Sequence, residues 1–393
     1  MAVRFEFATA ARIVFGPGTV REVPPAVREM GKRALLVTGR SQARVAPLVA
    51  ELKEAGVACF GCVVDDEPSI GLVRRGADFA RREQCDLVIA FGGGSAVDAG
   101  KAIAAVLTNP GDVMDYLEVV GKGQALTAPS APFIAVPTTA GTGTEVTRNA
   151  VLASAEHRVK VSMRSPRMLA RLAVIDPELT YDLPPAITAR TGLDALTQLI
   201  EPYTSLRANP MTDSFCLEGM ERVSRSLRRA YYEGHDPEAR ADMSLAALLS
   251  GLALANAGLG VVHGLAGPIG GMFPVAHGAV CAALLPCGME ANLGALRARA
   301  PGSEVLRRYD EIGRLLTGRP NATADDGVAW VKEISRELGI PPLGTYGIGK
   351  ENISSLVEKA LQASSMKANP IVLSPEELHA VLVRSVCANT PVR

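Results

Sequence analysis

Short apolar runs alternate with amphipathic stretches through the first half of the chain. The runs are continuous, which is typical of parallel strands buried on both faces, and the stretches between them predict covering helices. The expected strands are residues 34–38, 57–64, 86–91, 133–136 and 172–175, and two of the expected helices are residues 45–55 and 69–83. Ser69 is the expected N-cap of the second of these helices. This half is therefore predicted to be an α/β unit on a parallel sheet.

The pattern changes near residue 182, where Asp182-Leu183-Pro184-Pro185 interrupts the chain. After it the apolar positions follow a helical period, and no stretch predicts a strand. The expected helices are residues 186–204, 210–230, 237–258, 277–292, 303–316, 325–338, 351–362 and 375–388. Because 393 residues exceed one ordinary core, we expect two domains: an α/β domain at residues 1–182 and an all-α domain at residues 183–393.

Two further segments need interpretation. Residues 3–7 alternate apolar and charged side chains, and Ile13 and Phe15 continue the same parity, which predicts an edge strand or hairpin with one buried face. Residues 245–262 contain no charged side chain, so their length alone permits a membrane span. Ser250, Asn256 and several glycines favour a buried helix, which we expect to end at His263.

Charge and cysteine content narrow the class of protein. The 41 basic and 41 acidic residues cancel, which gives no electrostatic reason to expect nucleic acid or an anionic membrane as partner. The seven cysteines are odd in number and scattered, which is typical of reduced thiols in a cytoplasmic protein. Cys59 and Cys62 form a C-x-x-C pair, but they lie in an expected strand rather than at the start of a helix. The N-terminus has no signal-peptide apolar core.

Two stretches rich in glycine and hydroxyl groups follow expected strands. Residues 92–101, GGGSAVDAGK, lead from a strand into a helix, whose free N–H groups can bind an anion. Ser95 is the expected N-cap, and Asp98 would complete a capping-box-like arrangement. Residues 137–145, PTTAGTGTE, place hydroxyl groups at the carboxyl end of the next strand, where open α/β sheets bind ligands. Without a ligand, both stretches would be only tight, capped turns.

The helical half contains a candidate metal site. Asp194 and Gln198 are four residues apart on an expected helix and therefore share one face. His263 ends the apolar helix, and His277 opens the next helix after a glycine-rich loop at residues 264–274. One Asp and two His can supply three ligands and leave a position open, as in catalytic metal sites. Each residue taken alone has an ordinary alternative, as a solvated, capping or core side chain.

Taken together, these motifs resemble the iron-containing (group III) alcohol dehydrogenases, which are related to glycerol dehydrogenase and dehydroquinate synthase. The similarity rests on residues 92–101 and 137–147, Lys160 before Ser162–Pro166, Asp176-Pro177, GLDALT at 192–197 and the segment from His263 to His277. It implies a dinucleotide-binding α/β domain followed by a helical metal domain, as in the dehydroquinate synthase-like fold. It also implies a homodimer or higher homo-oligomer.

The resemblance assigns roles by position. The residues expected to contact NAD or NADP are Gly93, Gly94, Ser95, Asp98, Thr138, Thr139, Thr142, Thr147 and Lys160. The residues expected to hold the divalent metal, Fe(II) or Zn, are Asp194, Gln198, His263 and His277. Asp194, His263 and His277 would act in catalysis through that metal.

Three positions depart from the family pattern. Gln198 stands where the iron enzymes usually have His, and an amide oxygen is a weaker ligand than imidazole. Gly267 stands where many members have a His that contacts substrate or relays a proton. Gly39 stands where many members that prefer NAD have Asp, and it is followed by Arg40 and Ser41. This last change should allow NADP to bind.

The function implied by the resemblance is hydride transfer between NAD(P) and a small alcohol or aldehyde, assisted by a metal. One alternative is a lyase of the dehydroquinate synthase type, but the apolar segment 264–273 offers little for a phosphorylated polyol. The other is a non-catalytic nucleotide-binding protein, in which Gln198 and Gly267 mark a degenerate site. Asp194, His263, His277 and Lys160 argue against that second alternative.

Overall fold

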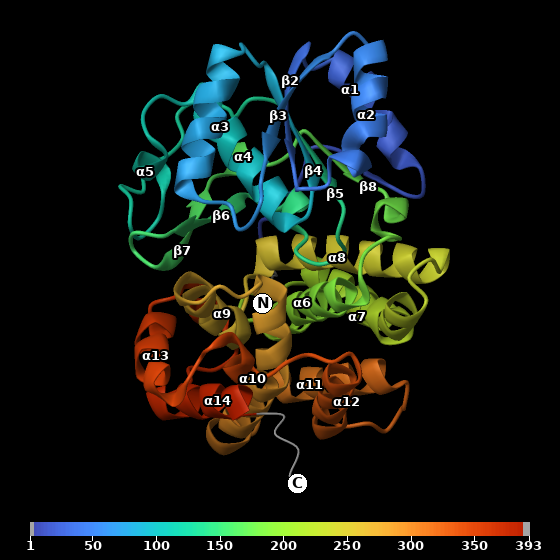
Figure 1. The fold of residues 1–393 in the computed structure, drawn as a ribbon. Coiled ribbons are helices and arrows are strands. Elements are labelled where there is room, and N and C mark those ends of the chain that lie inside the picture. Colours follow the sequence, from blue (N-terminus) through green and yellow to red (C-terminus); the bar gives the residue numbers. More distant parts are fainter. Residues whose placement is uncertain (1–3, 388–393) are drawn as a thin grey trace. The chain divides into compact units, whose positions relative to one another are not determined.

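The computed structural model describes residues 4–387, and their contacts divide into two compact units. The α/β unit comprises residues 8–139 and 143–182, and the helical unit comprises residues 183–387 together with the short segments 4–7 and 140–142. The contacts therefore change from one unit to the other between Asp182 and Leu183. In Figure 1 the colours follow the sequence, so the α/β unit runs from blue to green and the helical unit from green to red.

Six parallel strands form the sheet of the α/β unit in the order β1-β8-β5-β4-β2-β3. These strands are β1 (Ile13–Phe15), β2 (Arg33–Thr38), β3 (Ala58–Val63), β4 (Leu87–Gly92), β5 (Phe133–Pro137) and β8 (Leu172–Ile175). The expected parallel sheet is thus confirmed. The strand order reverses between β2 and β4, and ligands of such sheets bind beyond the carboxyl ends of the strands at this switch point.

Helices cover both faces of this sheet (Figure 1). They are α1 (Val23–Arg28), α2 (Gln42–Glu54), α3 (Ile70–Arg82) and α4 (Gly94–Thr108), and the short α5 (Val113–Tyr116) packs on α3. The unit's 3-10 helices are η1 (Thr19–Glu22), η2 (Thr144–Val146), η3 (Pro166–Met168) and η4 (Pro177–Thr180). Ser69 caps α3 by accepting a hydrogen bond from the Leu72 N–H, as predicted.

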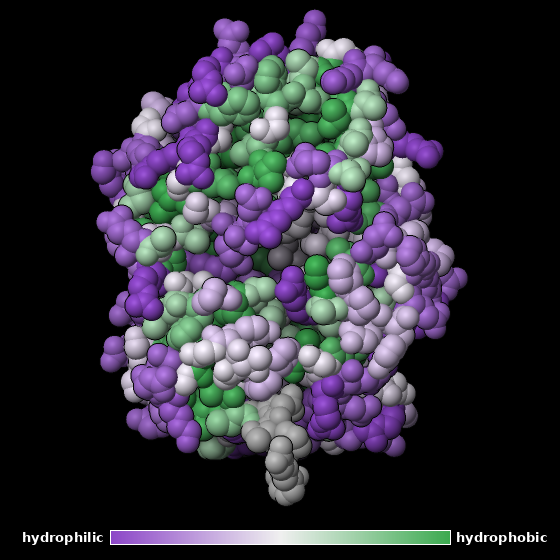
Figure 2. Space-filling view, in the orientation of Figure 1, coloured by the Kyte–Doolittle hydropathy of each residue, from purple (hydrophilic) through white to green (hydrophobic). Residues whose placement is uncertain are grey.

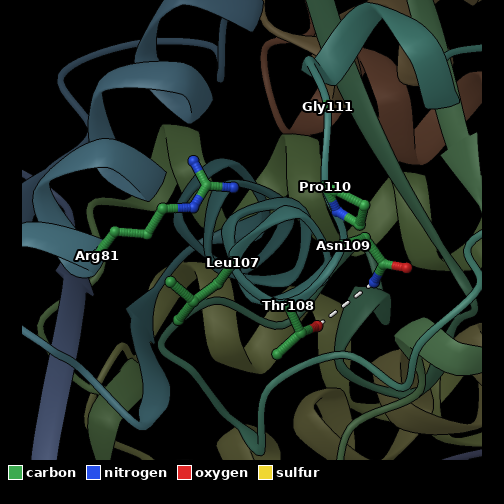
Figure 3. Close-up of a pocket in the computed structure, with 6 residues that line it drawn as sticks. All are labelled: Arg81, Leu107, Thr108, Asn109, Pro110 and Gly111. Atoms are coloured by element: carbon green, nitrogen blue, oxygen red, sulfur yellow. Dashed lines mark hydrogen bonds between the residues drawn. The ribbon is translucent and has the colours of Figure 1, made fainter.

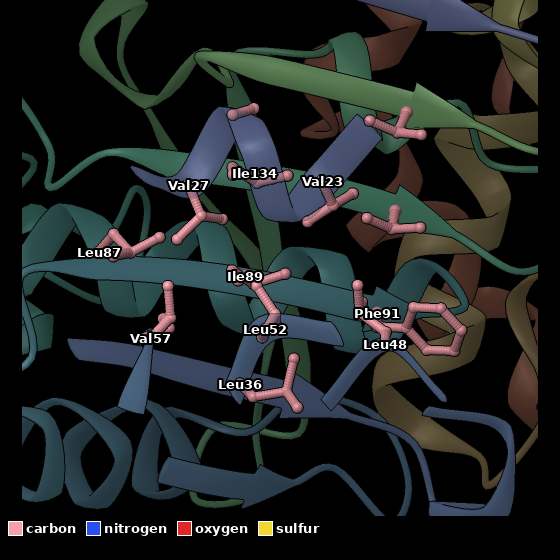
Figure 4. Packing of buried hydrophobic residues seen from close by; sticks show 14 of the residues in the cluster. Val23, Val27, Leu36, Leu48, Leu52, Val57, Leu87, Ile89, Phe91 and Ile134 are labelled. Atoms are coloured by element: carbon pink, nitrogen blue, oxygen red, sulfur yellow. The ribbon is translucent and has the colours of Figure 1, made fainter. Parts of the chain in front are cut away.

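The apolar runs supply the core between the sheet and helices α1 and α2 (Figure 4). Val27 of α1 and Leu52 of α2 pack with Leu36, Ile89 and Ile134 of the sheet, and all five are at most 4% exposed. Burying each such side chain stabilises the fold by roughly 1.5–3 kcal/mol. This packing fixes the carboxyl ends of β2 and β4, which lead into the turns at Gly39 and Gly93.

Two features of the first half of the chain differ from the expectation. The chain forms an antiparallel hairpin of β6 (Asn149–Ser154) and β7 (Val159–Arg164), which the sequence analysis did not predict. In the N-terminal segment only residues 13–15 form the expected edge strand, while residues 4–12 form no strand in this chain. The prediction for residues 4–7 was therefore wrong, and Val3 lies outside the described residues. Phe7 instead stacks against Phe215, with ring centroids 5.8 Å apart.

The helical unit contains no strand among its described residues, as predicted. Its helices are α6 (Pro185–Thr204), α7 (Pro210–Tyr232), α8 (Pro237–Ala257), α9 (Val261–Met272), α10 (His277–Arg299), α11 (Glu304–Thr317), α12 (Ala324–Glu337), α13 (Ile353–Leu361) and α14 (Pro375–Cys387). Its 3-10 helices are η5 (Leu343–Tyr346), η6 (Lys350–Asn352) and η7 (Ser364–Ala368). The fold predicted for the two halves of the chain is thus confirmed.

The glycine-rich loop expected at residues 264–274 is mostly helix α9, so that prediction was wrong. His263 lies in the first turn of α9 and does not end α8. Helices α8 and α9 meet at a bend of 98°. Eleven of the twelve α9 positions are either apolar or glycine, so no polar face marked the helix in the sequence.

One single helix of the described chain, α10, is long and apolar enough to cross a membrane. However, 78% of its most apolar window is buried inside the protein, as in a core helix. Residues 245–262 are divided between α8 and α9 and do not form a continuous span. On the face shown in Figure 2, hydrophobic areas are interspersed with hydrophilic residues.

Candidate functional site

Four side chains that can bind a metal gather in the helical unit. They are Asp194 on α6, His263 on α9, and His277 and Cys281 on α10. One ligand atom from each lies within 4.8 Å of the others. The structure therefore brings together the Asp and the two His that the sequence analysis selected from segments far apart in the chain.

Glycine at position 278 allows α10 to approach α6 closely. A Cβ atom added at Gly278 would lie 2.7 Å from the carbonyl oxygen of Arg190 and 3.5 Å from the Cβ of Asp194. The first distance is shorter than real Cβ contacts, so a larger residue would force the helices apart. This contact places His277 Nε2 3.9 Å from Asp194 Oδ1.

The four side chains Asp194, His263, His277 and Cys281 are called the metal group below. Glu201 orients His263 from the side opposite to the other three. Its Oε2 lies 2.6 Å from His263 Nδ1, and its Oε1 accepts a hydrogen bond of 2.7 Å from the Val262 N–H in the first turn of α9. A carboxylate at this helix start is stabilised by the helix dipole. Since Nδ1 donates to Glu201, the Nε2 lone pair of His263 points toward a metal, as in most metal-binding histidines.

The ionisable groups of this site shift one another's pKa values. Burial opposes ionisation of Asp194, but His277 and His263 outweigh it and lower the pKa of its carboxyl group. Burial also opposes the charged form of His263, yet Cys281, Glu201 and Asp194 raise its pKa well above the usual value. Burial raises the pKa of the Cys281 thiol to about 12. Asp194 Oδ1 is buried and makes no hydrogen bond, and a bound cation would satisfy it.

Gln198 and Gly267 have distinct surroundings. Gln198 is one helical turn beyond Asp194 and is 2% exposed, and its Oε1 lies 2.9 Å from Ser250 Oγ. Its role as a metal ligand stays a prediction. A Cβ added at Gly267 would meet nothing within 4 Å, so the space next to this position is open.

In the α/β unit, the glycine turn lies at the switch point of the sheet. Gly92 ends β4, and a Cβ there would lie 2.7 Å from Ala96 Cβ and 3.4 Å from the Gly39 backbone nitrogen. Gly39 directly follows β2. Two glycines thus bring the ends of the strands close together beneath the start of α4. This is the position at which such sheets bind the pyrophosphate of a dinucleotide.

The capping predicted within this turn was wrong. Gly93 is the N-cap of α4, with no side-chain cap, and Ser95 lies inside the helix. Asp98 instead accepts hydrogen bonds from the Thr144 hydroxyl and, at 3.1 Å, from the Val151 N–H. Gly93 leaves the first N–H groups of α4 without a side-chain cap, and such groups are the donors an anion needs.

Several predicted cofactor residues already have partners within the chain. Thr147 Oγ1 accepts a hydrogen bond of 2.9 Å from Lys101, and Lys160 Nζ lies 3.0 Å from Glu67. Arg40 is exposed and pairs with Asp65 and Asp66. Ser41 precedes α2 without capping it by its side chain. Thr138 is buried, and Gly94, Thr139 and Thr142 lie in or beside the two glycine-rich stretches. The roles of all these residues toward NAD(P) stay predictions.

A cavity of about 380 Å³ lies elsewhere in the α/β unit (Figure 3). It lies at the end of α4 and is lined by Arg81 and residues 107–111. Its cation, Arg81, is held by Asp78 and by the carbonyl oxygen of Val106. None of the residues that line it belongs to the group of side chains that can bind a metal, so it is not the candidate site.

The sequence analysis assigned no role to three buried residues of these sites. Cys281 is four residues after His277, and Glu201 is seven residues after Asp194, so each shares a helix face with a predicted ligand. These spacings were visible signals. Lys101 was part of the quoted glycine motif, but nothing in the sequence showed that its ammonium group is buried against Thr144 and Asn149.

Comparisons with known proteins agree with this arrangement. Residues 10–177 match the family described as iron-containing alcohol dehydrogenase, and residues 188–386 match the C-terminal domain of the same family. A choline dehydrogenase of Bacillus subtilis (strain 168) is 36% identical over 372 residues, which cover 93% of this chain and 90% of that protein. A 1,3-propanediol dehydrogenase of Klebsiella pneumoniae is also 36% identical, over 93% of this chain and 95% of that protein.

Solved structures show the same fold. A crystal structure of a 1,3-propanediol oxidoreductase superposes with a TM-score of 0.89 at 33% identity, covering 98% of this chain and all of that one (100%). The resemblance inferred from the motifs is thereby confirmed. The chain belongs to the iron-containing alcohol dehydrogenase family and is a metal-dependent oxidoreductase.

Proposed function

We propose that this protein interconverts a small alcohol and its aldehyde with NAD or NADP, at a divalent metal, Fe(II) or Zn, held by Asp194, His263 and His277. The observation that carries the proposal is the convergence of these three buried or half-buried side chains, with one carboxylate oxygen of Asp194 lacking a hydrogen bond. Glu201 supports it, because it fixes the proton of His263 on Nδ1.

The protein's own groups prepare the site. When bound, the metal polarises the oxygen of an alcohol or aldehyde as a Lewis acid, and the nicotinamide exchanges a hydride with the adjacent carbon. Asp194 and His263 are at most 8% exposed, so they meet the metal in surroundings of low dielectric constant, where charge interactions are strong. Glu201 holds the imidazole of His263 in one orientation. The open space at Gly267 leaves room for substrate and water.

The residues that follow β2 bear on whether NADP can bind as well as NAD. Gly39 places no carboxylate where a 2′-phosphate would lie, and Arg40 adds a cation next to it. Arg40 pairs with Asp65 and Asp66, but all three side chains are well exposed, and such surface pairs are weak. A 2′-phosphate can therefore compete for Arg40, and NADP should be usable as well as NAD.

The names of the relatives support a small alcohol, since they include a choline dehydrogenase and 1,3-propanediol dehydrogenases. We place the protein in the cytoplasm as a homodimer or higher homo-oligomer, in line with its scattered unpaired thiols. The apolar segment 264–273 offers few groups for the phosphorylated polyol that a lyase would bind.

The test is metal analysis combined with turnover. Purified protein should contain about one iron or zinc per chain, oxidise NADH or NADPH with members of an aldehyde panel, and lose activity on chelation. Asp194→Ala and His263→Ala should lose metal and turnover together. Full activity of either variant without metal would refute the proposal, as would wild-type protein that binds nucleotide but cannot be activated by iron or zinc.

A further inference from the structure

The metal group contains the thiol of Cys281, to which the family resemblance assigned no role. Cys281 follows His277 by one helical turn on α10, so both side chains project from the same face. Its Sγ lies 3.5 Å from His277 Nε2 and 3.8 Å from His263 Nε2. The side chain is completely buried, so it is shielded from solvent and directed into the group.

These distances match the edges of a tetrahedral metal site. Bonds of about 2.3 Å to sulfur and about 2.05 Å to nitrogen at tetrahedral angles separate the two ligand atoms by roughly 3.6 Å. The two sulfur–nitrogen distances of 3.5 and 3.8 Å lie on either side of that value. The Asp194 Oδ1 atom lies 3.6 Å from His263 Nε2, a few tenths of an ångström above the roughly 3.3 Å expected for oxygen and nitrogen ligands. A small inward movement would close the group around one ion.

Two observations independent of the cysteine show that this space suits a cation. Asp194 is 1% exposed, and its Oδ1 makes no hydrogen bond, an arrangement that is costly unless a ligand is present. Glu201 engages Nδ1 of His263, which leaves Nε2 as the atom facing Asp194 and Cys281. Side chains that can bind a metal therefore converge on one point from three different helices.

Gln198 is the competing candidate for the fourth position. Its Oε1 lies 2.9 Å from the Ser250 hydroxyl, and both side chains are at most 2% exposed. Ser250 can hold this neutral amide within the helix packing. A thiolate, by contrast, carries charge and is a ligand that zinc binds strongly in proteins.

We propose that Cys281 is a fourth protein ligand of the metal and that its thiolate makes zinc the ion this chain retains. The thiol proton is released to solvent when the metal–sulfur bond forms, so charge and atoms balance. The proposal rests on the metal site of the proposed function, and it goes beyond that function by naming the donor and the metal. Substrate would then bind by expanding the coordination from four to five.

The experiment uses full-length protein stripped of metal and reloaded with Co(II) or zinc alone. Co(II) bound to a thiolate absorbs in the near ultraviolet through charge transfer. Wild type and Cys287→Ser should show this band, and Cys281→Ser should lack it. Cys287 is the matched control, because it is a buried cysteine of the same helix outside the metal group. Cys281→Ser should also weaken zinc binding by at least roughly tenfold, since even residues behind the ligands contribute that much.

Zinc X-ray absorption on the unaltered protein provides a second test that needs no variant to fold. One scatterer at about 2.3 Å would establish the sulfur ligand, whereas a shell of only nitrogen and oxygen near 2.0–2.1 Å would overturn the proposal. Zinc affinity lost in Gln198→Leu but unchanged in Cys281→Ser would also overturn it, in favour of the amide. In both cases chelator-sensitive turnover could persist, and the proposed function would stand. Failure of wild type to bind any metal would instead refute the proposed function itself.

Discussion

At the scale of single residues, the α/β unit buries two ionisable groups, Lys101 and Glu145, beside the partly buried Asp98 near the second glycine-rich stretch. Lys101 is fully buried and donates hydrogen bonds to Thr144 and Thr147. Burial lowers the pKa of Lys101 to about 8, although Asp98 raises it. Burial raises the pKa of Glu145 to about 7, although a hydrogen bond from its own backbone and the charge of Lys101 lower it. The group is thus held together at a cost in stability.

Glu145 should make the protein less stable as the pH rises from about 4.5 to about 7. In this range the folded carboxyl group keeps a proton that the unfolded chain releases, because the pKa rises from 4.5 to about 7 on folding. Unfolding is therefore most costly at the acidic end, and the loss is complete above the folded pKa. At pH 8, Glu145→Gln should gain up to about 3 kcal/mol in unfolding free energy, reduced by the lost attraction to Lys101.

Urea unfolding followed by circular dichroism at pH 5 and pH 8 measures this effect. Glu118→Gln is the control, because Glu118 forms an exposed pair with Arg164 and should change stability little at either pH. An unfolding free energy for Glu145→Gln that stays below wild type at pH 8 would show that the charge of Glu145 is stabilising.

At this scale the sequence indicated which residues matter better than it indicated their hydrogen-bond partners. Asp194, His263 and His277 were selected because few residue types bind metals and because the family resemblance matched them by position, and the structure brings them together. Ser95 was assigned as an N-cap because serine prefers that position, but the N-cap is Gly93, two residues earlier, and the helix begins at Gly94. Asp98 was assigned to the same cap, yet β6 and η2 provide its donors. Such tertiary partners come from other segments and leave no local signal.

At the scale of helices and strands, glycine determines how closely α10 approaches α6. A Cβ at Gly278 would lie 2.7 Å from the backbone of α6, whereas a Cβ at Gly294, on the same helix α10, would meet nothing within 4 Å. A backbone oxygen cannot rotate away as a side chain can. The two glycines thus offer a matched comparison within one helix.

Gly278→Ala should destabilise the helical unit and weaken metal binding, because α10 must move away from α6 and carry His277 and Cys281 with it. A clash of this kind costs roughly 1–3 kcal/mol. Gly294→Ala should be neutral or stabilise by roughly 0.5–1 kcal/mol, since alanine favours helix over glycine. Thermal unfolding of the metal-free protein and zinc affinity measure the two effects. Equal zinc affinities in both variants would show that the close approach at Gly278 does not position the ligands.

Whether a helix or strand could be predicted depended on how its residues are buried. The five main strands are continuous apolar runs, and each was expected within a few residues of its observed place. The β6–β7 hairpin was missed although Val161 and Met163 alternate with Lys160 and Ser162, which is the period of a strand with one buried face. Helix α9 could not be recognised, because it is rich in glycine and has no polar face.

At the scale of the whole molecule, all candidate metal ligands belong to the helical unit, although they are distant in sequence. Asp194 lies on α6, His263 on α9, and His277 and Cys281 on α10. A bound ion therefore links three helices across long stretches of chain. An ion that binds only the folded state stabilises it by about 2.7 kcal/mol at a concentration one hundred times its dissociation constant.

This stabilisation should appear where the ligands are. Zinc added to metal-free protein should slow amide hydrogen exchange in α6, α9 and α10, because any local opening that separates these helices must first release the ion. Strands β2 and β4 contain no metal ligand of this group, so their exchange should change much less. In Asp194→Ala the same zinc concentration should leave all three helices unprotected.

Protection spread evenly over both units in wild type would mean that the ion acts on global unfolding rather than on the openings of one unit. If zinc protected α10 but neither α6 nor α9, the ion would be held by His277 and Cys281 alone, and the three-helix centre would be ruled out.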